Sequence, residues 1–196
     1  GGEGGTGAAP LEFTNRIGTP LVEGLIFVHN SLVGFDLRKE MRICTSGKIT
    51  TGFDIIKRLA MGADLCYSAR GMMMSLGCIQ ALKCNTNTCP VGVTTQDPGL
   101  VVGLVPEDKC KRVYNFQKNI IKSACEMMGA MGLEKTDDLK PWHLMRRTEA
   151  YEIRNYSEIY DFLKPGDLLK KSLPVSYARA VEAANAESFN DIHPSV

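Results

Sequence analysis

Apolar residues recur at helical spacing early in the chain, directly after Thr19 and Pro20. A threonine followed by a proline is typical of a helix start, because the hydroxyl can cap the helix and proline suits its first position. The apolar positions that follow are Leu21, Val22, Leu25, Ile26, Val28, Leu32 and Val33. They predict an amphipathic helix that ends near Gly34. His29 lies on or beside its apolar face, and we expect it to pack there with a local hydrogen bond.

The pattern then alternates between short apolar runs and a helical stretch. Residues 41–46 and 63–68 are predicted strands, and residues 53–61 between them are a predicted helix. A strand, a helix and a strand with short connections predict a right-handed parallel βαβ unit. The loop at 47–52 and the turn at 69–71 should therefore lie at the same edge of the sheet.

The loop before this predicted helix has features of an anion-binding turn. Thr51 and Asp54 have the spacing of a capping box, which leaves the N–H groups of Gly52 and Phe53 where a phosphate could bind. The loop is not a Walker motif, because Lys48 follows a single glycine and no G-K-[ST] sequence is present. From these residues alone, an ordinary glycine-containing turn is the simpler interpretation.

The second half of the chain is predicted to be mainly helical. A long helix from Arg112 to Gly132 is marked by the apolar positions Val113, Phe116, Ile120, Ala124, Met127 and Met131. Helical patterns recur over 151–163 and 175–189. We therefore divide the chain into a first part, 1–132, and a helical C-terminal extension, 133–196.

The first ten residues, GGEGGTGAAP, have no hydrophobic periodicity and carry five glycines in their first seven positions. Glycine lets a backbone approach a ligand closely, so this segment is interpreted as a ligand-facing loop that presents Glu3 and Thr6. A flexible tail is the alternative that the same composition allows.

Composition excludes several classes of partner. The chain of 196 residues carries 23 Lys and Arg against 22 Asp and Glu, so no net charge draws it to nucleic acid or to an anionic membrane. No apolar run approaches the roughly 20 residues of a membrane span, and no signal peptide is recognisable. Seven cysteines with clustered spacing in such a sequence point to a metal or redox site in a reducing compartment. We expect a soluble, cytoplasmic protein.

The candidate chemistry lies in the stretch GCIQALKCNTNTCPVG, residues 77–92. Cys78, Cys84 and Cys89 follow the spacing C-x5-C-x4-C, which lets three thiolates converge on one centre. Iron–sulfur clusters are held by such thiolates, and a proline also follows the last cysteine of the bacterial ferredoxin run, as Pro90 does here. Three ligands in one loop would suit a cluster with three irons.

Two other interpretations of these cysteines stay open. A zinc site usually needs four ligands in C-x2-4-C pairs, and no histidine is near to complete one, so zinc is the weaker metal hypothesis. Three free, buried thiols would also satisfy the sequence, since free cysteine is among the most buried residue types. Cys110 and Cys125 have no partner spacing and are expected to be packed thiols.

The motifs taken in order resemble a known family. A GGTGA loop, a strand ending in a glycine loop, a strand ending in A-x-G and the run GC-x5-CNTNTCPVG-x-x-TQ are similar to the FMN-binding synthase domain of glutamate synthase. The resemblance runs from Gly1 to about Gly132, and it is most specific over 2–10 and 77–96. The tail from Trp142 resembles shorter members of that family.

The resemblance implies a fold. The family has a (β/α)8 barrel, and this α/β chain would hold its C-terminal portion, the last βα units, followed by extra C-terminal helices. About six strands would be missing, so the chain alone cannot close a barrel. We expect its exposed strands to be covered by self-association, which makes a homo-oligomer the expected state.

The resemblance also implies cofactors. Barrels of this kind often bind phosphate through the loops after strands seven and eight, which agrees with the two turns identified above. The FMN contacts would be Gly47, Lys48, Gly52, Ala69, Arg70 and Gly71. Cys78, Cys84 and Cys89 would ligate a 3Fe-4S cluster that passes electrons to FMN. The substrate-side residues, near 2-oxoglutarate, would be Glu3, Gly4, Gly5 and Thr6.

The implied reaction is the reduction of 2-iminoglutarate, formed from 2-oxoglutarate and ammonia, to L-glutamate by hydride from reduced FMN. An electron donor protein or subunit is the implied partner. No catalytic residue is assigned, because the strands that would carry it are not in this sequence. No amidotransferase region with an N-terminal cysteine nucleophile is present, so we expect ammonia to come from elsewhere.

One turn departs from the family pattern. Many long-form members have D-G-G-L-R-T-G where this chain has Ser46 to Gly52, so an aspartate and a glycine are lost. Lys48 could compensate by facing the negative charge of reduced flavin. Two alternatives follow: an FMN oxidoreductase of the same fold with another substrate, or a non-catalytic domain for binding or assembly.

Overall fold

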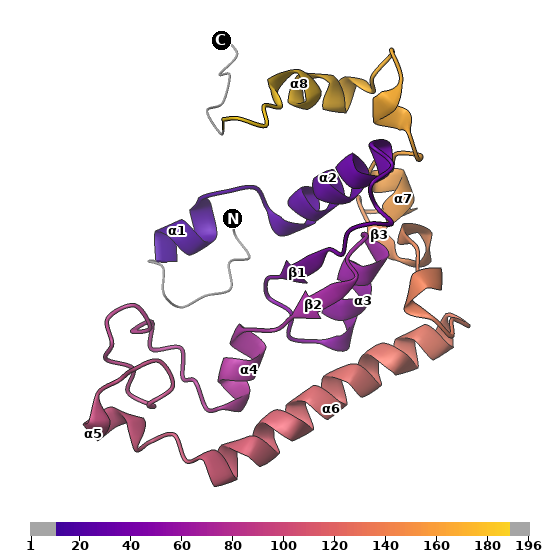
Figure 1. Ribbon diagram of the computed structural model, residues 1–196. Coiled ribbons are helices and arrows are strands. Elements are labelled where there is room, and N and C mark those ends of the chain that lie inside the picture. The colour runs from indigo at the N-terminus through magenta and orange to yellow at the C-terminus, as the bar shows by residue number, and fades with distance from the viewer. Residues whose placement is uncertain (1–10, 189–196) are drawn as a thin grey trace.

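The structure is a computed structural model that describes residues 11–188 (Figure 1). Its α-helices are α1 (Leu11–Arg16), α2 (Leu21–Gly34), α3 (Gly52–Ala60), α4 (Arg70–Ser75), α5 (Pro98–Val101), α6 (Pro106–Ala130), α7 (Tyr156–Ile159) and α8 (Val175–Ala183). Its strands are β1 (Cys44–Ser46), β2 (Leu65–Tyr67), β3 (Met145–Arg147) and β4 (Ile153–Asn155). Short 3-10 turns lie at η1 (Thr136–Asp138), η2 (Pro141–His143) and η3 (Asp167–Leu169). None of the helices in the described range is long and apolar enough to cross a membrane.

The predicted βαβ unit is confirmed. β1 and β2 pair in parallel, with Cys44 opposite Leu65 and Ser46 opposite Tyr67, and α3 connects them. The turns after both strands therefore lie at one edge of the sheet. Within the described residues β1 and β2 pair only with each other, so the larger barrel stays a prediction.

The long helix α6 packs across α3 and α4 (Figure 1). Two glycines permit the approach. A Cβ on Gly52 would lie 2.6 Å from the backbone nitrogen of Ala124, and a Cβ on Gly71 would lie 2.9 Å from Cζ of Phe116. A side chain at Gly52 would require the backbone of α6 to shift, and one at Gly71 would also lie 2.6 Å from Ser68 Oγ and 3.1 Å from the carbonyl oxygen of Ile49. α6 begins at Pro106, ahead of the predicted start at Arg112.

A single apolar core joins the two parts into which the sequence divides the chain. Its buried members are Val22, Leu25, Ile26, Ile43, Ile56, Ala60, Met61, Ala63, Ala124, Met128, Leu139, Leu144 and Tyr156. The last three come from the C-terminal extension and pack with α2, α3 and α6. The extension therefore completes the core of the first part, and the two parts are not separated by packing.

The helix predicted over 151–163 is wrong in part. β3 and β4 form an antiparallel hairpin, so residues 153–155 are strand and only Tyr156–Ile159 are helix. Asn155 explains the change, because its Oδ1 accepts from the N–H groups of Ser157 and Glu158 and so fixes the helix start at Tyr156. The predicted helix over 175–189 is confirmed over its first nine residues, as α8.

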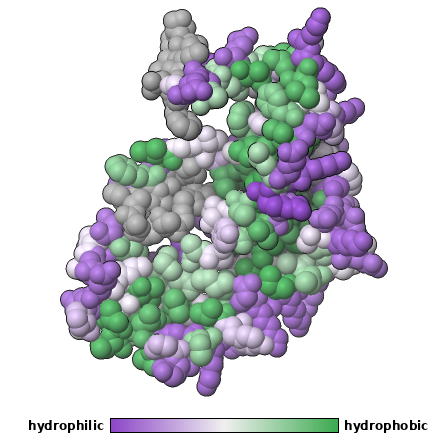
Figure 2. Space-filling model, in the orientation of Figure 1, coloured by the Kyte–Doolittle hydropathy of each residue, from purple (hydrophilic) through white to green (hydrophobic). Residues whose placement is uncertain are grey.

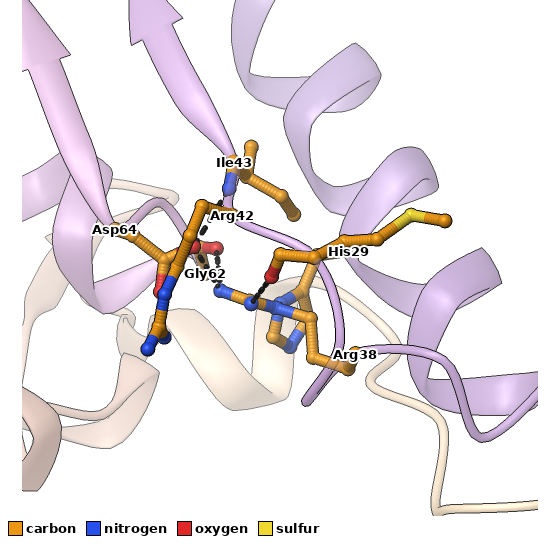
Figure 3. A network of polar contacts seen from close by, with 7 residues as sticks. His29, Arg38, Arg42, Ile43, Gly62 and Asp64 are labelled. Atoms are coloured by element: carbon orange, nitrogen blue, oxygen red, sulfur yellow. Dashed lines mark hydrogen bonds and ion pairs between the residues drawn. The ribbon is translucent and has the colours of Figure 1, made fainter.

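Arg38 ties the end of α2 to the turn between α3 and β2 (Figure 3). Its Nε donates to His29 Nδ1 at 3.2 Å, and its Nη2 donates to the carbonyl of Gly62 at 3.0 Å and to Asp64 Oδ2 at 2.8 Å. The same carboxylate oxygen accepts from the N–H of Ile43 at 2.7 Å. Burial, and then the charge of Arg38, lower the pKa of His29. The expectation of a packed, locally hydrogen-bonded histidine is confirmed.

Asn30 holds the C-terminal segment against α2. It is 1% exposed. Its Nδ2 donates to the carbonyl of Asp161 and to the hydroxyl of Tyr177, both at 2.8 Å, and its Oδ1 accepts from the N–H of Leu163 at 3.1 Å. The Tyr177 ring stacks on Phe27 with centroids 5.4 Å apart. α8 and the segment before it are therefore fixed by one buried polar side chain.

Candidate functional site

The two turns that follow β1 and β2 contact each other directly. The hydroxyl of Ser68, after β2, donates to the carbonyl of Ile49, after β1, at 2.5 Å. Gly47 is buried with φ 152°, and Lys48 is exposed with φ 47°. Positive φ is unusual for a lysine and places this residue in a left-handed turn. The predicted flavin turns are thus adjacent, with the Lys48 side chain open to solvent.

The start of α3 has the predicted capping box. The N–H of Asp54 donates to Thr51 Oγ1 at 3.1 Å, and the Asp54 carboxylate accepts from the N–H groups of Thr51 at 2.9 Å and Thr50 at 3.1 Å. Burial would raise the pKa of Asp54, but these hydrogen bonds hold it below its ordinary value. The N–H groups of Gly52 and Phe53 have no partner within a helix, so they stay directed toward the turn.

A phosphate at this turn therefore has a defined set of partners. The side chain of Lys48 and the first N–H groups of α3 suit an anion, whereas the Asp54 carboxylate repels it. Arg58 is 3% exposed, and its Nη2 lies 3.5 Å from the carbonyl of Gly47, which adds positive charge behind the turn. The residues fit a phosphate that lies toward Lys48 and away from Asp54.

Of the four other predicted flavin residues, two have a structural explanation. Gly52 lies against the backbone of α6, and Gly71 lies against Ser68, Ile49 and the Phe116 ring, so packing accounts for glycine at both positions. Ala69 is the residue before α4, and Arg70 is its first residue and is half-buried. The structure places these residues beside the first turn, and it gives Gly52 and Gly71 a role that needs no ligand.

The cysteine loop follows α4 and is wound through several left-handed residues. Gln80, Leu82 and Asn87 have φ values of 57°, 55° and 61°. The loop is closed by Asn87, whose carbonyl accepts from the hydroxyl of Thr95 at 2.6 Å and whose Oδ1 accepts from the N–H of Gln96 at 2.7 Å. A residue other than glycine is strained when its backbone is left-handed, and such strained residues cluster at functional sites.

Apolar side chains surround this loop on the surface. Ile79 and Leu82 are each 65% exposed, and Val102, just after α5, is 74% exposed. Figure 2 shows apolar residues gathered over this end of the molecule, at its lower left. The loop is therefore not an ordinary polar surface loop, and its cysteines lie in a partly apolar setting.

The three cysteines differ in environment. Cys78 and Cys84 are half-buried, and the N–H of Gln80 donates to Cys78 Sγ at 3.4 Å. Cys89 is 7% exposed. Burial would raise the pKa of the Cys89 thiol, but hydrogen bonds from backbone N–H groups lower it to about 7. The donors are Thr94, Val91 and Val93.

This environment favours the Cys89 thiolate, which is the form that binds metal. N–H groups directed at a cysteine sulfur also tune iron–sulfur clusters. Within residues 11–188, no three potential ligand side chains lie close enough to hold a metal ion. The three cysteines thus have the right chemistry to ligate an iron–sulfur cluster. To bind one, Cys78 and Cys84 would have to move toward Cys89.

Two positively charged residues beside this loop were missed from the sequence. Arg112 Nη1 and Lys109 Nζ lie 3.5 and 3.7 Å from the position that a Cβ on Gly77 would occupy. Gly77 directly precedes Cys78. The predicted helix begins at Arg112 and so leaves out Lys109, and the sequence does not show which loop the helix faces. Glu3, Gly4, Gly5 and Thr6, the predicted substrate-side residues, lie outside the described range.

Comparisons with known proteins give a consistent result. The family described as "Conserved region in glutamate synthase" matches residues 1–134. The chain is 39% identical over 159 residues to the glutamate synthase large subunit-like protein YerD of Bacillus subtilis, covering 81% of this chain and 30% of that protein. It is 37% identical over 140 residues to the archaeal glutamate synthase [NADPH] of Methanocaldococcus jannaschii, covering 71% of this chain and 28% of that enzyme. The chain thus spans less than a third of these relatives.

Proposed function

Because the chain belongs to the glutamate synthase family, we propose that it is the FMN- and cluster-binding portion of a glutamate synthase-type oxidoreductase. The complete protein would form L-glutamate reductively from 2-oxoglutarate and ammonia-derived nitrogen. The relatives named above are glutamate synthases or resemble one, which supports an oxidoreductase as the parent protein.

The observation that carries the proposal is the environment of Cys89. Cys89 is nearly buried, hydrogen bonds lower the pKa of its thiol to about 7, and it shares one loop with Cys78 and Cys84. We propose that these three cysteines hold a 3Fe-4S cluster. The backbone N–H groups that stabilise the Cys89 thiolate would then offset part of the negative charge on its sulfur.

The turns after β1 and β2 would hold FMN. Lys48 and the N-terminal end of α3 would bind its phosphate, and the buried Arg58 would add positive charge behind the turn. When bound, the flavin would supply hydride for reduction of a carbon–nitrogen double bond, and the cluster would supply electrons to the flavin. The residues of this chain would bind and orient these groups.

The cluster is tested by replacing Cys78, Cys84 and Cys89 singly with serine in the full-length protein. Each variant should lose the visible absorption of the cluster together with its iron and acid-labile sulfide. Cys110→Ser and Cys125→Ser are matched controls, because both cysteines are exposed on α6. If a control loses the cluster and a loop variant keeps it, the ligand assignment is wrong.

The flavin placement needs a variant that spares the fold. Gly47→Val does not, because Gly47 is buried at φ 152° and valine would be strained there. Lys48 is exposed, so Lys48→Gln should not change folding. It removes one positive charge, so FMN affinity should fall. Lys122→Gln, exposed on α6, is the control. Equal FMN affinity in the Lys48 variant and the control would contradict the placement.

The substrate is tested by following oxidation of the electron donor by the full-length protein in the presence of 2-oxoglutarate and an ammonium salt. Formation of L-glutamate supports the proposal. A protein that binds flavin and cluster but forms no glutamate would be an oxidoreductase for another substrate. A protein that binds neither cofactor would be a binding or assembly domain.

A further inference from the structure

Two cationic side chains of α6 converge on the start of the cysteine loop. Lys109 and Arg112 are separated by three positions, so they lie on one face of the helix. Their terminal nitrogens, Nζ and Nη1, lie 3.7 and 3.5 Å from a single point, the position of a Cβ on Gly77. The two charged groups are therefore close to each other and to the backbone that leads into Cys78.

The start of the loop is fixed relative to these two side chains. The N–H of Gly77 donates to the carbonyl of Met74 at 2.9 Å, and that of Cys78 donates to the carbonyl of Met73 at 3.0 Å, which continues α4 into the loop. α4 in turn packs against α6 through Gly71 and Phe116. The backbone at Cys78 is thus held relative to α6 by backbone hydrogen bonds and helix packing.

The positive charge is only partly balanced by the protein. Lys109 forms an ion pair with Asp108 at 3.3 Å, but the Asp108 side chain is 64% exposed and so is screened by water. No hydrogen bond or ion pair of the Arg112 guanidinium is found among the described residues. The Lys109 side chain is 19% exposed. The like charges of Lys109 and Arg112 repel each other, and a further anion beside them would offset that repulsion.

We propose that Lys109 and Arg112 stabilise the negative charge of the cysteine-bound cluster and raise its reduction potential. This inference rests on the proposed function. Reduction adds one electron to a centre that three thiolates already make negative, so nearby positive charge favours the reduced form. Lys109 and Arg112 need not touch the sulfurs to act, because a charge within a few ångströms of the loop contributes through a partly apolar medium.

The test is a redox titration of the full-length protein, followed by the visible absorption and the paramagnetic resonance of the cluster. Lys109→Gln and Arg112→Gln should each lower the reduction potential, and the double variant should lower it further. At a fixed potential, the ratio of reduced to oxidised cluster should fall by about tenfold in Lys109→Gln, and by less in Arg112→Gln because water screens the exposed Arg112 charge. Iron and sulfide content should not change.

Two controls separate charge from packing. Lys109→Arg keeps the charge and should keep the potential. Lys122→Gln removes an exposed charge of the same helix, paired with Glu126, and should have no effect. Since Arg112 is exposed, its variant should fold even if Lys109→Gln does not, and it then carries the test alone.

The outcomes distinguish this inference from the proposed function. A wild-type protein without iron and sulfide would overturn both. A wild-type protein that holds the cluster, with equal potentials in Arg112→Gln and Lys122→Gln, would overturn this inference and leave the proposed function standing. A potential that falls in Lys109→Arg as much as in Lys109→Gln would also overturn it, because packing and not charge would then be the cause.

Discussion

Replacing Asn30 with alanine should release the C-terminal segment from α2. Asn30 is 1% exposed and makes three hydrogen bonds, to the carbonyl of Asp161, the hydroxyl of Tyr177 and the N–H of Leu163. Alanine removes all three bonds at once. The groups left behind have no other partner in place, since the amide was their common one.

The magnitude follows from those unpaired groups. A buried donor or acceptor left unsatisfied costs about 1–3 kcal/mol, and the N–H of Leu163 and the hydroxyl of Tyr177 both lose their partner. Asp161 is exposed, so water can replace the bond that its carbonyl loses, and this carbonyl adds little to the cost. A local destabilisation of about 3 kcal/mol is expected, which corresponds to an opening constant about 100-fold larger.

Hydrogen exchange measures that opening. Amides of the segment 160–183 should exchange about 100-fold faster in Asn30→Ala, while those of α3 and α6 should change far less. Asn119→Ala, exposed on α6, is the matched control and should leave exchange unchanged. Exchange in 160–183 that stays within about threefold of the wild type would refute the anchoring role of Asn30. A uniform acceleration of the whole chain would refute its local character.

Three further predictions follow from the fold. Gly62→Ala should lower the free energy of unfolding by at least about 2 kcal/mol in thermal unfolding, because φ is +104° and a Cβ would overlap the His29 ring. Gly129→Ala is the control, because open space surrounds Gly129, and it should not lower the free energy of unfolding. Burial and the adjacent guanidinium lower the pKa of His29 below 6.5, so stability should decline as pH falls from 6.5 through that lowered pKa, and His29→Gln should flatten this decline. The isolated chain should self-associate in light scattering, because Leu65 and Tyr67 are 54% and 60% exposed on the uncovered face of β2; a concentration-independent monomer would contradict this.

Local signals in the sequence identify the βαβ unit and its capping box. Period-two runs, a threonine with an aspartate three residues later, and a glycine at the end of α3 each act within a few residues, so they can be recognised without tertiary knowledge. The start of α6 was also readable. Pro106 followed by Glu107 and Asp108 is a helix start, with proline at the first position and acidic residues in the first turn.

Features that depend on packing could not be predicted in this way. The hairpin over 145–155 carries helix-compatible residues, and Asn155 is as compatible with a turn inside a helical pattern as with a cap. The three cysteines lie in one loop, yet only Cys89 is nearly buried, and backbone N–H groups of the following turn lower the pKa of its thiol. The spacing of cysteines in a sequence shows which of them could bind one metal centre, but not where each one lies in the fold.

The glycines of the two predicted flavin turns show why a motif needs the structure. All are predicted flavin contacts by resemblance to the family. A Cβ on Gly52 would meet the backbone of α6, whereas a Cβ on Gly71 would meet Ser68 and Ile49 as well as the Phe116 ring, so packing accounts for both glycines. Lys48, exposed in a left-handed turn, has no such explanation in the described residues. A ligand-binding role at this edge therefore rests on Lys48 and the start of α3, and substitutions at Gly52 or Gly71 would report on helix packing instead of flavin binding.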